Sequence, residues 1–71
     1  MRKNSVVGKC LLSNLLYSLH LTQEDLSVKT TISKHQLSAY ANNKREMSLS
    51  NARIISRALG CDIEELYEWK D

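Results

Sequence analysis

Two helix-start signals lie only 11 residues apart, and this spacing constrains the fold more than any other feature of the sequence. Thr22 is followed three residues later by Asp25, and Ser33 is followed three residues later by Gln36. A Ser or Thr side chain placed in this way accepts a hydrogen bond from a free backbone N–H at a helix start, and the residue three positions on can reach back. The helix between the two caps therefore spans about 23–29, roughly two turns.

Apolar residues flank both caps and predict how the two helices meet. Leu21 and Leu26 surround the first cap, and Ile32 and Leu37 surround the second, as in a hydrophobic staple. Because the connecting turn has only about three residues, the two short helices cannot lie side by side and must cross steeply. This geometry is that of a helix-turn-helix, whose second helix enters the major groove of DNA.

Three further segments show helix signals. The segment from Val7 to Leu19 carries apolar residues at steps of three and four. Ser48 can cap a helix that ends before Gly60, and Asp62, with Glu65 three residues later, can cap a last one. The sequence therefore predicts an all-α, compact five-helix domain covering residues 1–71, with helices at about 7–19, 23–29, 34–41, 49–59 and 63–69.

Composition and charge narrow the function. The 71 residues contain no Pro and only two Gly, which disfavours a multi-stranded β fold, and so short a chain offers little room for a catalytic cleft. Nine basic and only three acidic residues lie in 1–61, while 62–71 is acidic. A basic body favours a polyanion partner, above all nucleic acid, although a solvated surface explains the same charges.

Metal and catalytic motifs are missing from the sequence. The two His and two Cys do not combine at a metal-ligand spacing, and no Cys–His pair or carboxylate dyad stands out. We therefore expect no catalytic residue, metal, cofactor or small-molecule ligand. Cys10 and Cys61 are interpreted as buried thiols, and no run approaches the roughly 18 apolar residues of a membrane span. These features are typical of a cytoplasmic protein.

A family resemblance follows from the residues between Thr22 and Leu66, which read TQEDLSVKTTISKHQLSAYANNKREMSLSNARIISRALGCDIEEL. This run resembles, without a gap, the Cro/lambda-repressor-type (Xre family) DNA-binding domain, whose usual pattern is TQEELAxxxGVSxxxISxxENGKRxPSLExLxKIAxALGVSxDEL. The resemblance implies a lambda-repressor-like fold with the helix-turn-helix at about 22–42. The chain departs from the pattern at Thr31 and Asn43, where the family usually has Gly, and at Thr30, where it usually has Leu.

The polar side of the second motif helix supplies the candidate base contacts. Leu37 and Tyr40 form its apolar pair and should point inward. At 100° per residue, the opposite side then carries the donors, acceptors and methyl group that could read base edges. The expected base contacts are Lys34, His35, Ser38 and Ala39. The alternative is a polar face that only contacts solvent.

A second group of residues is expected to hold the DNA backbone. Gln23 lies in the first turn of its helix, where free N–H groups favour an anion. The resemblance implies that Gln23 touches phosphate and braces the recognition helix, and that the loop after this helix lies along the backbone. The expected backbone contacts are Gln23, Ser33, Asn42, Asn43, Lys44 and Arg45. An ordinary polar loop is the alternative, and Arg53 and Arg57 are assigned to a solvated face.

The predicted function is a sequence-specific, duplex-DNA-binding transcriptional regulator. The resemblance implies a Cro-like or Xre-type repressor of phage, prophage or mobile-element origin, acting as a homodimer on a near-palindromic operator in a bacterial or phage-infected cytoplasm. Met47, Tyr67 and Trp69 are candidates for self-association, since the Tyr and Trp are expected to remain partly exposed. Two alternatives stay open: an antitoxin or accessory regulator with a protein partner, and a helical interaction module without DNA affinity.

Overall fold

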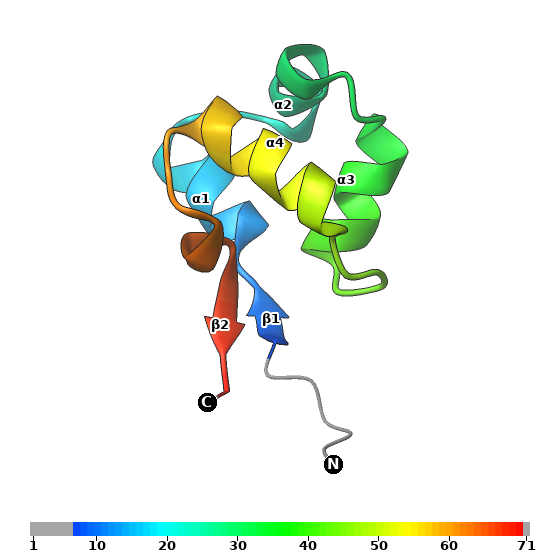
Figure 1. The fold of residues 1–71 in the computed structure, drawn as a ribbon. Coiled ribbons are helices and arrows are strands. Elements are labelled where there is room, and N and C mark those ends of the chain that lie inside the picture. Colours follow the sequence, from blue (N-terminus) through cyan, green and yellow to red (C-terminus); the bar gives the residue numbers. More distant parts are fainter. Residues whose placement is uncertain (1–6, 71) are drawn as a thin grey trace.

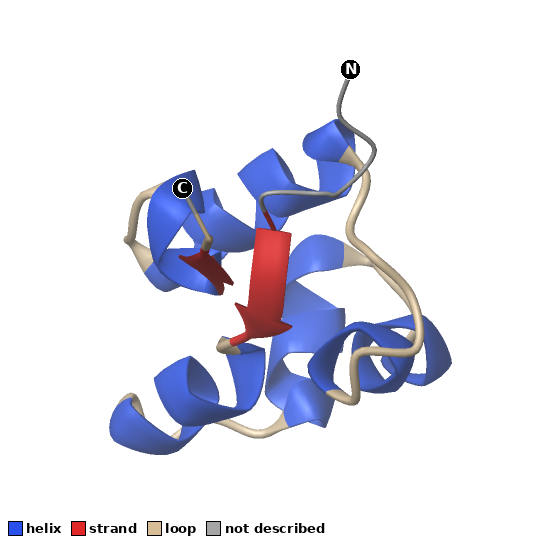
Figure 2. Cartoon of the chain, turned by 90° about the horizontal axis from the view of Figure 1, so that it is seen from below, coloured by secondary structure: helices blue, strands red, loops and turns tan. Residues whose placement is uncertain are grey.

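The computed structural model describes residues 7–70, in which a small strand pair projects from one end of a group of helices (Figures 1 and 2). In chain order, the elements are β1 (Val7–Cys10), α1 (Leu12–Ser18), α2 (Gln23–Thr30), α3 (Lys34–Ala41), α4 (Leu49–Leu59), the short 3₁₀ helix η1 (Ile63–Leu66) and β2 (Tyr67–Trp69).

Three of the predicted helix starts are confirmed by hydrogen bonds. The Thr22 hydroxyl accepts from the backbone N–H of Asp25, whose carboxylate accepts in return from the N–H of Thr22, both at 3.0 Å. The Ser33 and Ser48 hydroxyls each accept, at 3.1 Å, from the N–H three residues on. Gly60, at φ 73°, ends α4 in the left-handed conformation. Because these signals are local, the predicted bounds of α2, α3 and α4 agree closely with the structure.

The prediction of an all-α, five-helix fold is wrong at both ends of the described chain. Val7–Cys10 does not begin a helix, and Tyr67–Trp69 does not continue one. The two segments form an antiparallel pair in which Val7 faces Trp69 and Cys10 faces Tyr67, with an irregularity between these pairs (Figure 1). Tyr, Glu and Trp alternate apolar and polar side chains in β2, and aromatic residues favour strands.

The last predicted helix is shortened to the four residues of η1. Asp62 precedes η1 in extended conformation but makes no side-chain capping bond, so its predicted capping role is wrong. The chain instead turns into β2, and the backbone N–H of Leu11 donates to the carbonyl of Leu66 at 2.8 Å. This bond links the end of η1 to the start of α1.

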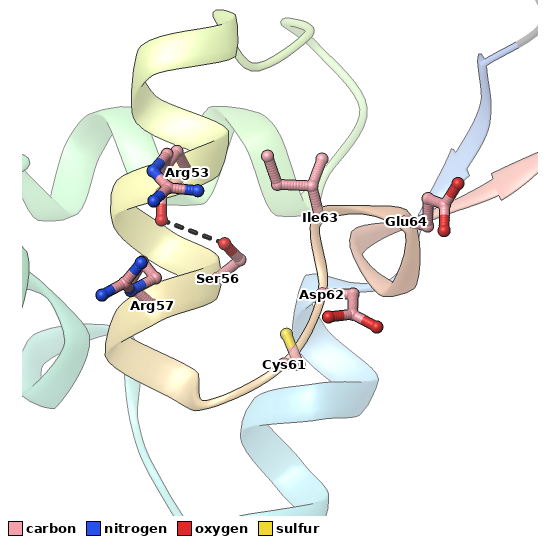
Figure 3. Close-up of a pocket in the computed structure, with 7 residues that line it drawn as sticks. All are labelled: Arg53, Ser56, Arg57, Cys61, Asp62, Ile63 and Glu64. Atoms are coloured by element: carbon pink, nitrogen blue, oxygen red, sulfur yellow. Dashed lines mark hydrogen bonds between the residues drawn. The ribbon is translucent and has the colours of Figure 1, made fainter.

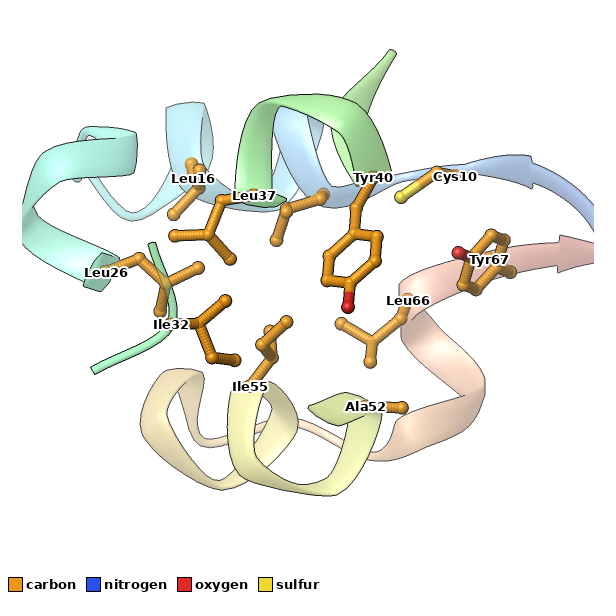
Figure 4. Close-up of a cluster of buried hydrophobic side chains, with 11 residues drawn as sticks. Cys10, Leu16, Leu26, Ile32, Leu37, Tyr40, Ala52, Ile55, Leu66 and Tyr67 are labelled. Atoms are coloured by element: carbon orange, nitrogen blue, oxygen red, sulfur yellow. The ribbon is translucent and has the colours of Figure 1, made fainter. Parts of the chain in front are cut away.

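The core lies between α3 and α4 and is closed by α1, α2 and β2 (Figure 4). Its fully buried side chains, each less than 2% exposed, are Leu12, Leu26, Leu37, Tyr40, Ile55 and Leu66. Both staple residues on the helix sides of the caps, Leu26 and Leu37, are 0% exposed, so they anchor α2 and α3 in the same cluster. Burial of a leucine side chain contributes about 2 kcal/mol.

Both cysteines are free thiols. Cys10 is buried as predicted, whereas Cys61 is half-buried. Burial raises the pKa of the Cys10 thiol, and burial together with the carboxylates of Glu65 and Asp62 raises the pKa of Cys61. Burial also raises the pKa of Tyr67. These groups therefore stay protonated at neutral pH.

The turn between α2 and α3 contains a left-handed threonine. Thr31 has φ 63°, as its alignment with a family glycine indicates, and this conformation strains a β-branched residue. Its neighbour Thr30 is buried, and its hydroxyl donates to the Leu26 carbonyl at 2.8 Å and accepts from the Ile32 N–H at 3.2 Å. The Thr30 hydroxyl thus occupies a core position by satisfying two backbone groups.

Replacing Thr31 with Gly should stabilise the protein. A non-glycine residue in the left-handed region costs about 1–3 kcal/mol, and the added freedom of glycine in the unfolded chain offsets part of the gain. We expect the free energy of unfolding in urea to rise by about 1 kcal/mol for Thr31→Gly and by less for Thr31→Asn. A Thr31→Gly protein no more stable than the parent would contradict the assigned strain.

Replacing Gly8 with Ala should destabilise the strand pair. A Cβ atom at Gly8 would lie 2.8 Å from the carbonyl oxygen of Glu68, so one strand must shift. We expect a loss of about 1–3 kcal/mol, the usual cost of overpacking. Gly60→Ala is the matched control because its Cβ would meet nothing within 4 Å and only its φ of +73° is strained. The prediction fails if Gly8→Ala is the less harmful of the two in thermal melts.

Candidate nucleic-acid interface

Helix α3 is anchored by one side and exposes the other. Leu37 and Tyr40 are 0% and 1% exposed, so they fix the inner side against the core. Lys34 and His35 are exposed, and Ser38 and Ala39 are half-exposed. The predicted orientation of α3 is therefore confirmed, and the four expected base-contact residues lie on its accessible side. Figure 1 shows α3 at the edge of the fold.

Short polar bonds fix α2 against the turn that leads into α3. The Ser27 hydroxyl donates to the carbonyl of Ile32 at 2.7 Å, and the backbone N–H of Thr31 donates to the carbonyl of Ser27 at 2.7 Å. Ser27 begins the last turn of α2. Its two bonds hold the segment that enters α3 close to the end of α2, so the angle of the exposed helix is set locally.

Lys34 lies beside α2. Its Nζ is 4.0 Å from Oε1 of Glu24, and the two side chains are 63% and 76% exposed. An ion pair so exposed to solvent contributes little, at most about 1 kcal/mol. The contact therefore orients the lysine without preventing it from binding another acceptor.

The loop after α3 is exposed and well tied to its surroundings. Asn42, Asn43, Lys44 and Arg45 are all exposed. Asn43 has φ 61°, which Asn tolerates better than most residues, and its Oδ1 accepts from the backbone N–H of Cys10 at 2.8 Å. The N–H of Lys44 donates to the carbonyl of Ala39 at 2.9 Å. The loop is thus fixed both to α3 and to β1.

A hollow of 310 Å³ opens along the exposed side of α3. It is lined by Ser33, His35, Gln36, Ala39 and Arg45, so it brings the loop next to predicted base-contact residues. From the sequence, Gln36 is expected only as a partner of the Ser33 cap. Its side chain instead donates from Nε2 to the Tyr40 hydroxyl at 2.9 Å, a bond that the i, i+4 spacing allows.

The other expected backbone contacts occupy the starts of the two helices. Gln23 is half-buried in the first turn of α2, and within residues 7–70 its side chain makes no hydrogen bond to α3. Ser33 is exposed, and its hydroxyl is used in the cap. Among these residues, the bracing of α3 by Gln23 that the resemblance implies is therefore not made by a side-chain hydrogen bond.

Two further hollows lie apart from these residues. The larger, 410 Å³, is lined by Arg53 and Arg57 of α4 and by the segment from Cys61 to Glu64 (Figure 3). Both arginines are exposed, in agreement with their assignment to a solvated face. The smaller, 190 Å³, is mainly apolar and includes Met47, Leu49 and Trp69.

The two terminal aromatic residues differ in exposure. Trp69 is 40% exposed, as expected, and its Nε1 donates to the carbonyl of Glu64 at 2.7 Å. Tyr67 is only 8% exposed, so its expected exposure is wrong. The Tyr67 ring packs in β2, and its hydroxyl accepts from the N–H of Met47 at 3.0 Å. This partly buried bond provides a partner for the hydroxyl of the inward-pointing Tyr67.

Comparison with known proteins agrees with this geometry. Residues 12–71 match the Cro/C1-type HTH DNA-binding domain. The chain therefore belongs to the Cro/C1-type family of helix-turn-helix DNA-binding domains.

Two relatives come from the same bacterium. The chain is 42% identical over 65 residues to the "SPbeta prophage-derived uncharacterized HTH-type transcriptional regulator YopS" of Bacillus subtilis (strain 168), covering 90% of this chain and 88% of the relative. It is 36% identical over 59 residues to the similarly described YotL of the same organism, covering 82% and 74%. In the part of the chain that the structure describes, no helix is long and apolar enough to cross a membrane.

Substitutions of Asn43 should separate its two structural roles. Asn43→Gly keeps the left-handed conformation and removes the acceptor for the Cys10 N–H, whereas Asn43→Ala loses both. We expect losses of about 1 kcal/mol and 2 kcal/mol in the free energy of unfolding. Hydrogen exchange of the Cys10 amide should accelerate in both variants. An unchanged exchange rate would contradict the assigned hydrogen bond.

Proposed function

We propose that the chain is a sequence-specific, duplex-DNA-binding transcriptional repressor of phage or prophage type, which acts as two copies on a near-palindromic operator. The observation that carries this proposal is the orientation of α3, with Leu37 and Tyr40 buried and His35 exposed. Membership of a DNA-binding family and the prophage origin of both relatives support it.

The exposed side of α3 supplies the chemistry for reading base edges. Lys34 can donate to O6 or N7 of guanine, and His35 and Ser38 can donate or accept. The Ala39 methyl can contact the methyl group of thymine. In this proposal, α3 enters the major groove and these four side chains distinguish the operator from other sequences.

The residues around α3 are proposed to hold the two strands of phosphates. Gln23 and Ser33 lie at the N-terminal ends of α2 and α3, where helix dipoles favour anions. Lys44 and Arg45 extend from a loop that is fixed to β1 through Asn43. Such contacts position the protein on any sequence, because phosphates carry no base identity. Asn42 and Asn43 complete this proposed contact set.

Two copies would place their recognition helices in successive major grooves, about 34 Å apart. Bound in this way, they would prevent RNA polymerase from occupying an overlapping promoter. We propose that Met47 and Trp69 take part in self-association on DNA, since both line the mainly apolar hollow of 190 Å³. A protein that sediments as a monomer on its operator would contradict this part of the proposal.

Alanine substitutions should separate base contacts from phosphate contacts. Lys34→Ala and His35→Ala should weaken operator binding by about 1–3 kcal/mol and random-sequence binding by less. Lys44→Ala should weaken both alike and reduce the salt slope of log K by about one. Fluorescence anisotropy across a salt series measures both quantities.

Lys29→Ala is the matched control, since Lys29 is an exposed lysine outside α3 and its loop. We expect Lys29→Ala to change operator binding and random-sequence binding by the same amount. This change should be smaller than the loss of operator binding in Lys34→Ala or His35→Ala. If Lys34→Ala, His35→Ala and Lys44→Ala all leave DNA binding unchanged, the proposed interface is wrong. Selection of duplexes from a random pool should recover an inverted half-site repeat.

A further inference from the structure

The side chain of Gln36 is held by a partly buried hydrogen-bond network that joins two helices. Its Nε2 donates to the Tyr40 hydroxyl at 2.9 Å, and Nδ2 of Asn51, in α4, donates to the same hydroxyl at 2.8 Å. Tyr40 is 1% exposed and is part of the core. The hydroxyl is therefore a fixed point to which both side-chain amides are attached.

This attachment determines which atom Gln36 can offer to a ligand. In a planar amide the carbonyl oxygen and the NH₂ group point in different directions from the same carbon atom, so an NH₂ group turned toward Tyr40 directs the oxygen away from this hydroxyl. Gln36 lines the same hollow as His35, Ala39 and Arg45. A side chain that is already tied to the Tyr40 hydroxyl loses less rotamer entropy when it binds a ligand in this hollow.

We propose that Gln36 is a further specificity-determining residue and that its Oε1 accepts a hydrogen bond from an exocyclic amino group in the major groove. This inference rests on the proposed function. The amino groups available there are N6 of adenine and N4 of cytosine. One N–H bond of Gln36 is engaged by Tyr40, and its carbonyl oxygen stays available as the acceptor that these amino groups require. Tyr40 and Asn51 are positioning residues for this contact.

The proposal is tested by selecting duplexes from a random pool with the full chain and with three variants. In each half-site, the parent should prefer adenine or cytosine at the one position that Gln36 contacts. The preferred base then identifies which amino group is bound. Gln36→Ala should reduce the preference at that position about tenfold and leave the other positions unchanged. Tyr40→Phe, which keeps the buried ring, should reduce the preference at the same position.

The third variant, Gln36→Glu, separates recognition from simple packing. A carboxylate is still an acceptor and the Tyr40 hydroxyl can donate to its second oxygen, so the preference for an amino-bearing base should persist although overall affinity falls. Tyr17→Phe, at an 85% exposed tyrosine of α1, is the matched control for loss of a hydroxyl and should leave the motif unchanged. Thermal melts establish that each variant is folded.

The outcomes distinguish this inference from the proposed function. If the parent selects no motif, the proposed function fails. If the parent selects a motif that Gln36→Ala reproduces with equal preference at every position, the inference is overturned and the proposed function stands. A uniform loss of affinity in Gln36→Ala, with no position relaxed, also overturns it. If a folded Tyr40→Phe keeps the full preference, Tyr40 does not position Gln36.

Discussion

Burial of Leu37 and Tyr40 is the constraint on which the exposed surface of α3 depends. A helix of eight residues has too few turns to hold its orientation without tertiary contacts, so these two side chains determine its rotation. Once they are fixed in the core, the helical period places His35 and Ala39 outward and Gln36 at the border between core and hollow. The interface is therefore a consequence of how the core is filled.

In the turn between α2 and α3, this chain has hydroxyl-bearing residues at positions where the usual family pattern has glycine and leucine. Thr30 and Ser27 satisfy carbonyl and amide groups around the turn with bonds of 2.7–3.2 Å. Thr31 adopts the left-handed backbone conformation in the same turn. These hydroxyls are tolerated away from solvent because each has a hydrogen-bond partner in the backbone. The turn is thus held by hydrogen bonds where apolar packing is reduced.

Local signals in the sequence were sufficient for the helices of the motif, and non-local pairing was not predictable. Ser33 and Ser48 cap α3 and α4 through bonds to residues three positions away, so the sequence contains all the necessary information. The pairing of Val7 with Trp69 joins residues at opposite ends of the chain, and the step of three from Val7 to Cys10 fits a helix equally well. The helices expected at both ends of the described chain were therefore wrong, whereas the helix-turn-helix between them was predicted correctly.

The same distinction applies to the candidate site. The orientation of α3 follows from its own periodicity and was predicted, whereas DNA contacts by its residues remain a prediction. Attachment of Gln36 depends on Asn51 in another helix, which no pattern within α3 indicates. Burial of Tyr67 likewise depends on the backbone of Met47, twenty residues earlier. Contacts between elements thus account for what the sequence could not show.

The bond from the Cys10 amide to Asn43 Oδ1 connects the terminal sheet to the loop that follows α3. Because β1 is itself held by β2, fraying of this short ribbon would release the acceptor and increase the motion of Asn43 and its neighbours. The order of the Asn42–Arg45 loop would then vary with temperature as the ribbon opens. The strand pair of β1 and β2, in addition to the helix-turn-helix itself, would determine how rigid the loop after α3 is.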